Sequence, residues 1–366
     1  MVYFISDVLS FLESWAPPAY QEGYDNAQLI VGNPSTKVTG ILCTLDATEE
    51  VVAEAAEKGC NLIIAHHPIV FKGLKSLTGK TYVERTVIKA IKEDIAIYAI
   101  HTNLDHVMGG VNSKIAEKLG LTNTRILSPK AGILAKLVTF IPVSDTAHVL
   151  QGLFAAGAGE IGAYRNCSFR VNGIGTFLPT EKANPTLGIR GVLEEVAEDR
   201  VEILFPKHLS TQIVSKLRQI HPYEEVAYYL QSLENENQEV GAGMIGELEA
   251  EMDELAFLTF LKSAMNLSII RHTKLLGRKI RRVAVCGGAG IFLLGAAKRA
   301  GADLFITADV KYHEFFDADN QLIIVDIGHY ESEFFTKELL KDKLSEKFAN
   351  IALYLSNAVT NPISYL

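Results

Sequence analysis

Cysteine, tryptophan and long apolar runs are scarce in this chain of 366 residues, which has four cysteines and one tryptophan. Cys43, Cys60, Cys167 and Cys286 lie far apart without any CxxC spacing, which argues against a disulfide framework and against a zinc-thiolate site. No run of eighteen apolar residues is present to span a bilayer. A net charge of −8 offers no basic stripe to a nucleic acid, although a small phosphorylated substrate remains compatible with it.

The composition is that of a globular protein, with 48% hydrophobic and 21% charged residues. A length of 366 residues favours two domains, because a single core seldom grows that large. The N-terminal segment MVYFISDVLSFLESW carries acidic residues and no basic region, so it predicts an amphipathic helix rather than a signal peptide. We therefore expect a cytoplasmic protein without a membrane partner.

An internal repeat organises the chain. Residues 41–67 match residues 283–309 at a constant offset of 242, and each copy predicts a strand, a helix ending at a glycine (Gly59 or Gly301) and a second strand. Asp46 and Glu49 fit the capping-box pattern for the first of these helices. Alternating strands and helices predict a mostly parallel sheet in each half, and the two α/β halves are expected to face each other about a pseudo-twofold axis.

The segment between the halves has a different pattern and reads as an inserted domain. It predicts the order β, α, β, β, α, β of a ferredoxin-like α+β domain, with a loop at TEKANPTLG (180–188) and an acidic return linker at ENENQEV (234–240). The expected division is a core of residues 1–126 and 241–366, interrupted by a domain of residues 127–240.

Histidines and carboxylates follow three predicted strands. The strands IAIYAI (95–100) and QLIIVDI (321–327) each lead to a histidine with a carboxylate four residues later, and the strand NLIIA (61–65) leads to a His-His-Pro sequence. The carboxyl ends of parallel strands are where α/β sheets bind ligands. The six candidate ligands are His66, His67, His101, Asp105, His329 and Glu333.

Four imidazoles and two carboxylates suit two divalent metal ions better than one. These donors suit Zn, which we expect first, and also Fe, Mn, Co or Ni. Each motif alone is typical of an exposed turn, but three of them at strand ends, two at equivalent places in the repeat, predict a metal site. Paired cations polarise a substrate oxygen and activate water, so the set indicates hydrolytic chemistry.

Other polar residues near these strand ends are weaker candidates. The repeat places Ala308 and Asp309 where the first half has its histidine pair, so the site should be asymmetric, with Asp309 and His313 lining the cleft. For His313, proton transfer and plain packing are equal alternatives. Asp25 fits a turn or cap, with contact to the cleft as the other alternative.

Two further motifs have ordinary structural explanations. The CGGAG turn (286–290) fits a tight turn, with phosphate contact as the alternative, but lacks the GxGxxG and GK[ST] patterns. The HPYEE segment (221–225) of the insert fits an exposed polar turn, and we assign it no catalytic role.

Ordered motifs over most of the chain carry a family resemblance. DNAQLIVG, LIIAHHPIVFKG, IHTNLD, GGAG, TADVKYHE and IGHYESE resemble, in that order, the Nif-three-like dinuclear metal-centre family. In the insert, GEIGAYRNCSF, GIGTFLP and HPYEEVAYY resemble the CutA-like or PII-like domain of longer bacterial members. The resemblance implies that the six candidates are metal ligands. It also implies a ring-shaped homohexamer with its metal sites facing an internal cavity and the insert capping the openings.

Many members of that family are labelled homologs of GTP cyclohydrolase I type II. The resemblance therefore implies a metal-dependent opening of the purine imidazole ring. A nearby acid must protonate the leaving nitrogen, and our own candidates for it are His313 and Glu331. Two alternatives stay open. One is metal-dependent hydrolysis of a phosphoester or an amide. The other is a non-enzymatic hexameric scaffold or metal carrier whose insert binds an effector or partner, which a closed coordination shell would favour.

Overall fold

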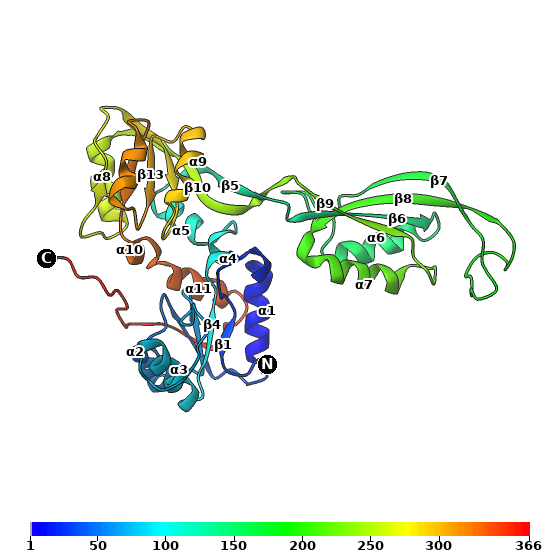
Figure 1. Ribbon diagram of the computed structural model, residues 1–366, viewed down its shortest axis with the longest axis horizontal. Coiled ribbons are helices and arrows are strands. Elements are labelled where there is room, and N and C mark those ends of the chain that lie inside the picture. The colour runs from blue at the N-terminus through cyan, green and yellow to red at the C-terminus, as the bar shows by residue number, and fades with distance from the viewer. Residues whose placement is uncertain (1) are drawn as a thin grey trace. The chain divides into compact units, whose positions relative to one another are not determined.

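A computed structural model describes residues 2–366 and shows two compact units (Figure 1). One unit combines Met1–Ser128 with Glu239–Leu366, and the other is Pro129–Gln238. Each observed boundary lies two residues from the expected one. The discontinuous unit is the mixed α/β core, and the continuous unit is the insert.

The first half of the core is built on a sheet of five strands in which β2, β3 and β4 run parallel. In spatial order the strands are β1 (Leu29–Val31), β4 (Ala96–Ala99), β3 (Leu62–Ala65), β2 (Gly40–Thr44) and β15 (Ala352–Leu355). Every residue of the three central strands is buried, because helices cover both faces. On one face, α2 (Glu49–Glu57) and α3 (Tyr82–Lys92) form an apolar core with the sheet.

The second half is built on a sheet of six strands, in which β12, β13 and β14 are parallel and β10 and β11 pair antiparallel to their neighbours. In spatial order the strands are β11 (Arg271–His272), β14 (Ile323–Asp326), β13 (Leu304–Thr307), β12 (Lys279–Val285), β10 (Glu236–Asp253) and β5 (Thr122–Ala131). Its helices are α8 (Glu254–Ala264), η3 (Ile291–Leu293), α9 (Leu294–Arg299) and η4 (Tyr312–Ala318).

The repeat predicted from the sequence is present in the fold. Strands β3 and β13 begin at residues 62 and 304, and the helical segments before them begin at residues 49 and 291. Both segments end near a glycine with positive φ, +68° at Gly59 and +69° at Gly301. The predicted parallel arrangement of the central strands is thus confirmed in both halves.

Each half also contributes a helix to the other half. Helix α5 (Val111–Lys118) follows the first three parallel strands but contacts β12, whereas α11 (Thr336–Ser345) follows the second three and contacts β2 and β15. This exchange joins the halves into one unit.

The N-terminal helix α1 (Ile5–Trp15) is amphipathic as predicted and buries Ile5, Val8, Leu9 and Leu12. A 3-10 turn, η1 (Pro18–Tyr20), follows it. The predicted capping box at α2 is wrong, because Thr48 is the N-cap residue and accepts a hydrogen bond from the Val51 amide at 3.3 Å. Within residues 2–366, no helix is both long and apolar enough to cross a bilayer.

The insert is a four-stranded antiparallel sheet with two helices against one face, in the predicted order of elements (Figure 1). In chain order the elements are β6 (Leu134–Pro142), α6 (Thr146–Ala155), β7 (Phe169–Phe177), β8 (Glu194–Pro206), η2 (Lys207–Leu209), α7 (Ser210–Ile220) and β9 (Tyr228–Leu233). The predicted acidic linker is wrong in part, since residues 236–240 already belong to β10. The closer likeness to CutA or PII proteins stays a prediction.

Candidate metal centre

The predicted ligands stand at the carboxyl ends of three strands of the core. His66 and His67 directly follow β3, and His101 follows β4 at the start of α4 (Thr102–Asp105). The third strand, β14, is followed by α10 (His329–Glu333). In α10 the histidine and the carboxylate are one turn apart, and His329 Nε2 lies 3.1 Å from Glu333 Oε2. The spacing of four residues therefore places both donors on one face.

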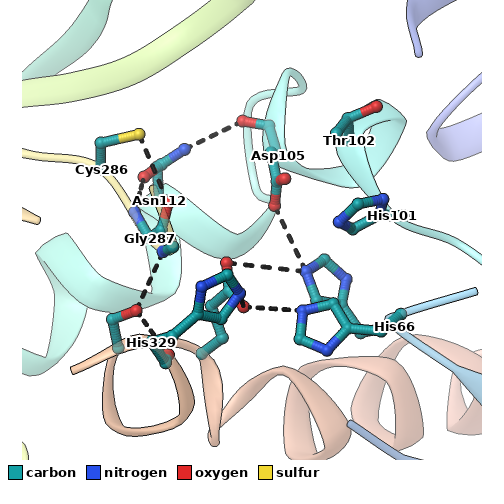
Figure 2. A network of polar contacts seen from close by, with 12 residues as sticks. His66, His101, Thr102, Asp105, Asn112, Cys286, Gly287 and His329 are labelled. Atoms are coloured by element: carbon teal, nitrogen blue, oxygen red, sulfur yellow. Dashed lines mark hydrogen bonds and ion pairs between the residues drawn. The ribbon is translucent and has the colours of Figure 1, made fainter. Parts of the chain in front are cut away.

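The structure brings all six predicted ligands together. Their donor atoms form three overlapping groups in which all atoms lie within 4.8 Å of one another. The groups are His66 with His67 and His101, His67 with His329 and Glu333, and His66 with Asp105 and Glu333. Figure 2 shows four of these side chains, His66, His101, Asp105 and His329, near one another.

All four histidines are anchored through the same nitrogen. Each Nδ1 lies within 2.8 Å of a protein oxygen, so each Nε2 is left to face the centre of the cluster. The partners are the Ile100 carbonyl for His66, Asp46 for His67, Asp25 for His101 and Asp309 for His329. Metal-binding histidines in proteins are held in this way by an oxygen acceptor on the second nitrogen.

Two buried donor atoms of the cluster lack a hydrogen-bond partner among the described residues. They are His66 Nε2 and Asp105 Oδ1, which lie 3.6 Å apart. Complete burial lowers the pKa of His66 to about 3, so its imidazole is neutral, which is the form that ligates metals. Because buried polar atoms rarely stay unpaired, this pair fits a cation placed between them.

The carboxylates of the cluster attract positive charge. Glu333 is 3% exposed, and burial alone would raise the pKa of its carboxyl group. Its contacts with His329 and with His67 Nε2, the latter at 2.9 Å, instead hold that pKa well below the usual value. Burial would lower the pKa of His67, yet Asp46 and Glu333 raise it to about 10. Burial and the nearby Glu333 charge raise the pKa of Asp105. A divalent cation would satisfy both carboxylates at once.

A chain of hydrogen bonds fixes the two halves around the cluster (Figure 2). Asn112 donates to the Asp105 carbonyl and accepts from the Gly287 amide, both at 3.0 Å. The next amide, at Gly288, donates to Ser332 Oγ at 2.9 Å, and Ser332 donates to the His329 carbonyl at 2.8 Å. These bonds link α5 of the first half to α10 of the second.

The CGGAG turn allows close approach to Glu333. Gly288 has φ +60°, and a Cβ atom there would lie 2.6 Å from Glu333 Oε1. The amides of Gly287, Gly288 and Gly290 already donate to Asn112, Ser332 and Thr307. The segment is therefore a tight turn, because those three amides already donate to protein acceptors rather than being left for a phosphate.

The two predicted catalytic acids lie outside the lining of the cavity at the cluster. His313 is exposed and lies beside the rings of Tyr312 and Phe316. Glu331 Oε1 accepts a hydrogen bond from Asn361 at 3.0 Å. Their catalytic roles stay predictions. Asp309 is also outside the cavity lining, but its carboxylate contacts His329 Nδ1 at 2.7 Å.

The cavity beside the cluster has a volume of about 570 Å³. Its wall includes five of the six candidate ligands together with Tyr24, Phe71 and Phe292, whose rings are exposed. The Tyr24 and Phe71 ring centroids are 6.2 Å apart, and Phe71 lies 6.1 Å from His101. Among the described residues, no lysine or arginine lines this cavity.

Sequence reasoning missed several residues that support the cluster. Asp46 was interpreted as a cap, but its carboxylate contacts His67 Nδ1 at 2.7 Å and accepts from Thr360 at 2.6 Å. Its position directly after a strand was the available signal. For Asp25 the sequence favours a turn or cap. The structure shows the alternative, because the Asp25 carboxylate contacts His101 Nδ1. Asn112 and Ser332 carried no sequence signal.

Comparison with known proteins identifies the family of the chain. The family model described as Duf34/NIF3 (NGG1p interacting factor 3) matches residues 4–362. The chain belongs to the Duf34/NIF3 family. Two relatives of similar length, from Halalkalibacterium halodurans and Bacillus subtilis, are named "GTP cyclohydrolase 1 type 2 homolog". They are 39% and 38% identical, and each alignment covers 98% of both chains.

A solved Duf34/NIF3 structure is also similar over the whole chain. It is a Bacillus cereus protein described as related to NIF3, with 38% identity, a TM-score of 0.87 and full coverage of both chains. The α/β core is therefore the fold of this family.

Proposed function

We propose that the chain is a hydrolase that works with two divalent cations held by the six clustered side chains. Of the candidate metals, we propose Zn as the native one. The observation that carries the proposal is the pair of buried, unpartnered donor atoms, His66 Nε2 and Asp105 Oδ1, at the centre of four histidines anchored through Nδ1. Cations bound there would polarise a substrate oxygen and make water a stronger nucleophile.

The protein side chains contribute orientation in this proposal. Asp25, Asp46 and Asp309 accept hydrogen bonds from the Nδ1–H groups of three histidines and fix the planes of their rings. Little reorganisation of these rings is therefore needed when a cation binds. The bonds through Asn112 keep the donors of the two halves at a fixed separation. Preorganised donors of this kind are what hydrolytic sites require.

For the substrate we propose a purine nucleotide such as GTP. One water would add to the carbon between the two imidazole-ring nitrogens and open the ring to a formamide, and a second water would hydrolyse the formamide and release that carbon as formate. The name borne by the relatives suggests this reaction. The exposed rings of Tyr24 and Phe71 at the cavity support it, because aromatic side chains stack on planar bases.

The experiment is formate release from GTP by the purified protein before chelation, after chelation, and after adding back Zn, Mn, Fe or Co. We expect release that is lost on chelation and restored by a metal. Metal binding without formate release would reject the cyclohydrolase assignment, and screening phosphoesters and amides would then separate another hydrolase from a scaffold.

A further inference from the structure

The insert contains a cavity of its own, with a volume of about 380 Å³. It lies on the sheet face opposite helices α6 and α7. Val201, Ile203 and Phe205 of β8 face the helices, and Glu198 lies on the other face because alternate strand residues point to opposite sides. Pockets of roughly 300–1,000 Å³ are the usual size for small ligands.

A carboxylate is buried in the floor of this cavity. Glu198 is only 8% exposed, and its side chain crosses β7 at Gly175, where a Cβ atom would lie 2.0 Å from Glu198 Oε2. A glycine in a strand often marks such a close approach. The absence of a side chain at Gly175 thus leaves space for this carboxylate. Burying an apolar side chain there would cost less free energy than burying a carboxylate.

The buried carboxylate has little compensation from the protein. Among the described residues its one hydrogen-bond donor is the Tyr223 hydroxyl, which donates to Oε1 at 2.8 Å. An ionised carboxylate can accept about four hydrogen bonds, and Oε2 is open to the cavity, so it can accept from a ligand bound there. No lysine or arginine is among the described residues that line the cavity. A ligand with positively charged N–H donors would supply the missing partners.

Apolar side chains form much of the remaining wall of the cavity, and a chain segment closes it from above. Phe140, Phe177, Leu178 and Leu187 line it. The segment above the sheet is tied down where Thr186 Oγ1 donates to the Pro222 carbonyl at 2.7 Å. A second bond, from the Asn184 amide to Glu224 at 2.6 Å, adds to this closure. The HPYEE segment, interpreted from the sequence as an exposed turn, therefore forms one side of a built cavity.

We propose that this cavity binds a small organic cation, an amidinium or ammonium group on an apolar body, with the cationic group on Glu198 and the body against Phe140 and Phe177. This site is independent of the proposed function of the metal centre. Glu224 and Glu225 at the rim add negative charge that favours the same class of ligand.

The test uses the full chain and benzamidine as the probe, with benzoate and benzyl alcohol as probes of similar size and different charge, each measured by calorimetry. We expect binding of benzamidine alone. Glu198→Gln should weaken it tenfold or more, because a charge-assisted hydrogen bond is lost. Glu195→Gln, at an exposed position of the same strand, is the matched control and should bind as the unaltered chain does.

Three results would overturn the proposal. The first is equal binding of benzamidine and benzyl alcohol, and the second is equal affinity of the Glu198→Gln and Glu195→Gln variants. The third is a change in the oligomeric state of Glu198→Gln without any benzamidine binding to the unaltered chain. In that case a basic side chain of a second copy, rather than a small molecule, is the partner of Glu198. Circular dichroism of each variant establishes that it is folded.

Discussion

The two ring nitrogens of each histidine in the candidate metal centre have different partners. Nδ1 contacts a carbonyl or carboxylate oxygen, and Nε2 faces the other donors. Three of these oxygens belong to aspartates outside the predicted ligand set. Their contribution should appear as metal affinity rather than as folding stability.

Asp46→Asn tests this role. The amide cannot supply the negative charge that holds the His67 ring, so we expect metal affinity to fall by about 10- to 100-fold while the fold is kept. Competition with a chromogenic chelator measures the affinity. Asp317→Asn, at an exposed position, is the control. Equal affinities in both variants would mean that Asp46 does not orient a ligand.

The close packing of Glu333 against Gly288 can be tested by substituting the glycine. Gly288→Ala places a Cβ atom 2.6 Å from Glu333 Oε1, so we expect a displaced carboxylate and a loss of bound metal. Gly277→Ala is a matched control, because its φ is +72° and no atom lies within 4 Å of the added Cβ. Both variants carry a similar backbone cost of about 1 kcal/mol. Metal analysis should separate them, and equal metal contents would contradict the close contact.

The six clustered residues could be predicted because their pattern is local. A histidine and a carboxylate four residues apart after an apolar run can be read from one segment, as at His101 and at His329. Asp46 and Asn112 could not be assigned, because their roles depend on segments that meet only in the folded chain. His313 lies close to Asp309 in sequence, yet η4 leaves it exposed outside the cavity lining.

At the scale of elements, helix α2 is tied to the C-terminal segment by one side chain. Glu54 accepts hydrogen bonds from Lys58 and Ser356, both at 2.6 Å, and from the Asn357 amide at 2.9 Å. Burial alone would raise the pKa of Glu54, but these bonds hold it at about 2. This contact helps to hold β15, which precedes the segment, beside β2.

The depressed pKa predicts a pH dependence of stability. The contribution of Glu54 is fully present above the unfolded pKa of about 4.5 and is lost as pH falls toward about 2. Glu54→Gln should therefore lower the free energy of unfolding at pH 6, and the difference from the unaltered chain should shrink between pH 4.5 and pH 2. Urea unfolding of the chelated proteins measures it, with exposed Glu57→Gln as the control. A difference independent of pH would contradict the role of this carboxylate.

The repeat and the insert could be predicted at this scale because each strand and helix has its own period of apolar residues. The order of elements in the insert followed from that pattern. The pairing of β15 with β2, and the exchange of α5 and α11 between the halves, could not be predicted, because these contacts join segments that are distant in the chain. The prediction of a linker at residues 236–240 was wrong because polar composition does not prevent pairing within a long strand.

At the scale of the whole molecule, the two halves of the core are needed for one site. The first half supplies His66, His67, His101 and Asp105, and the second supplies His329 and Glu333. The proposed ring-shaped hexamer is a separate question that the resemblance raised, and light scattering of the 40.1 kDa chain tests it. All six candidate ligands belong to a single chain.

The most direct test of the central claim is metal analysis of the purified, zinc-loaded chain beside His67→Ala and Glu333→Ala. The account predicts two metal ions per chain and a loss of bound metal in both variants with the fold retained, because both side chains follow the strands rather than pack in the apolar core. Retention of two ions per chain by both variants, or an unaltered chain that binds none, would contradict it.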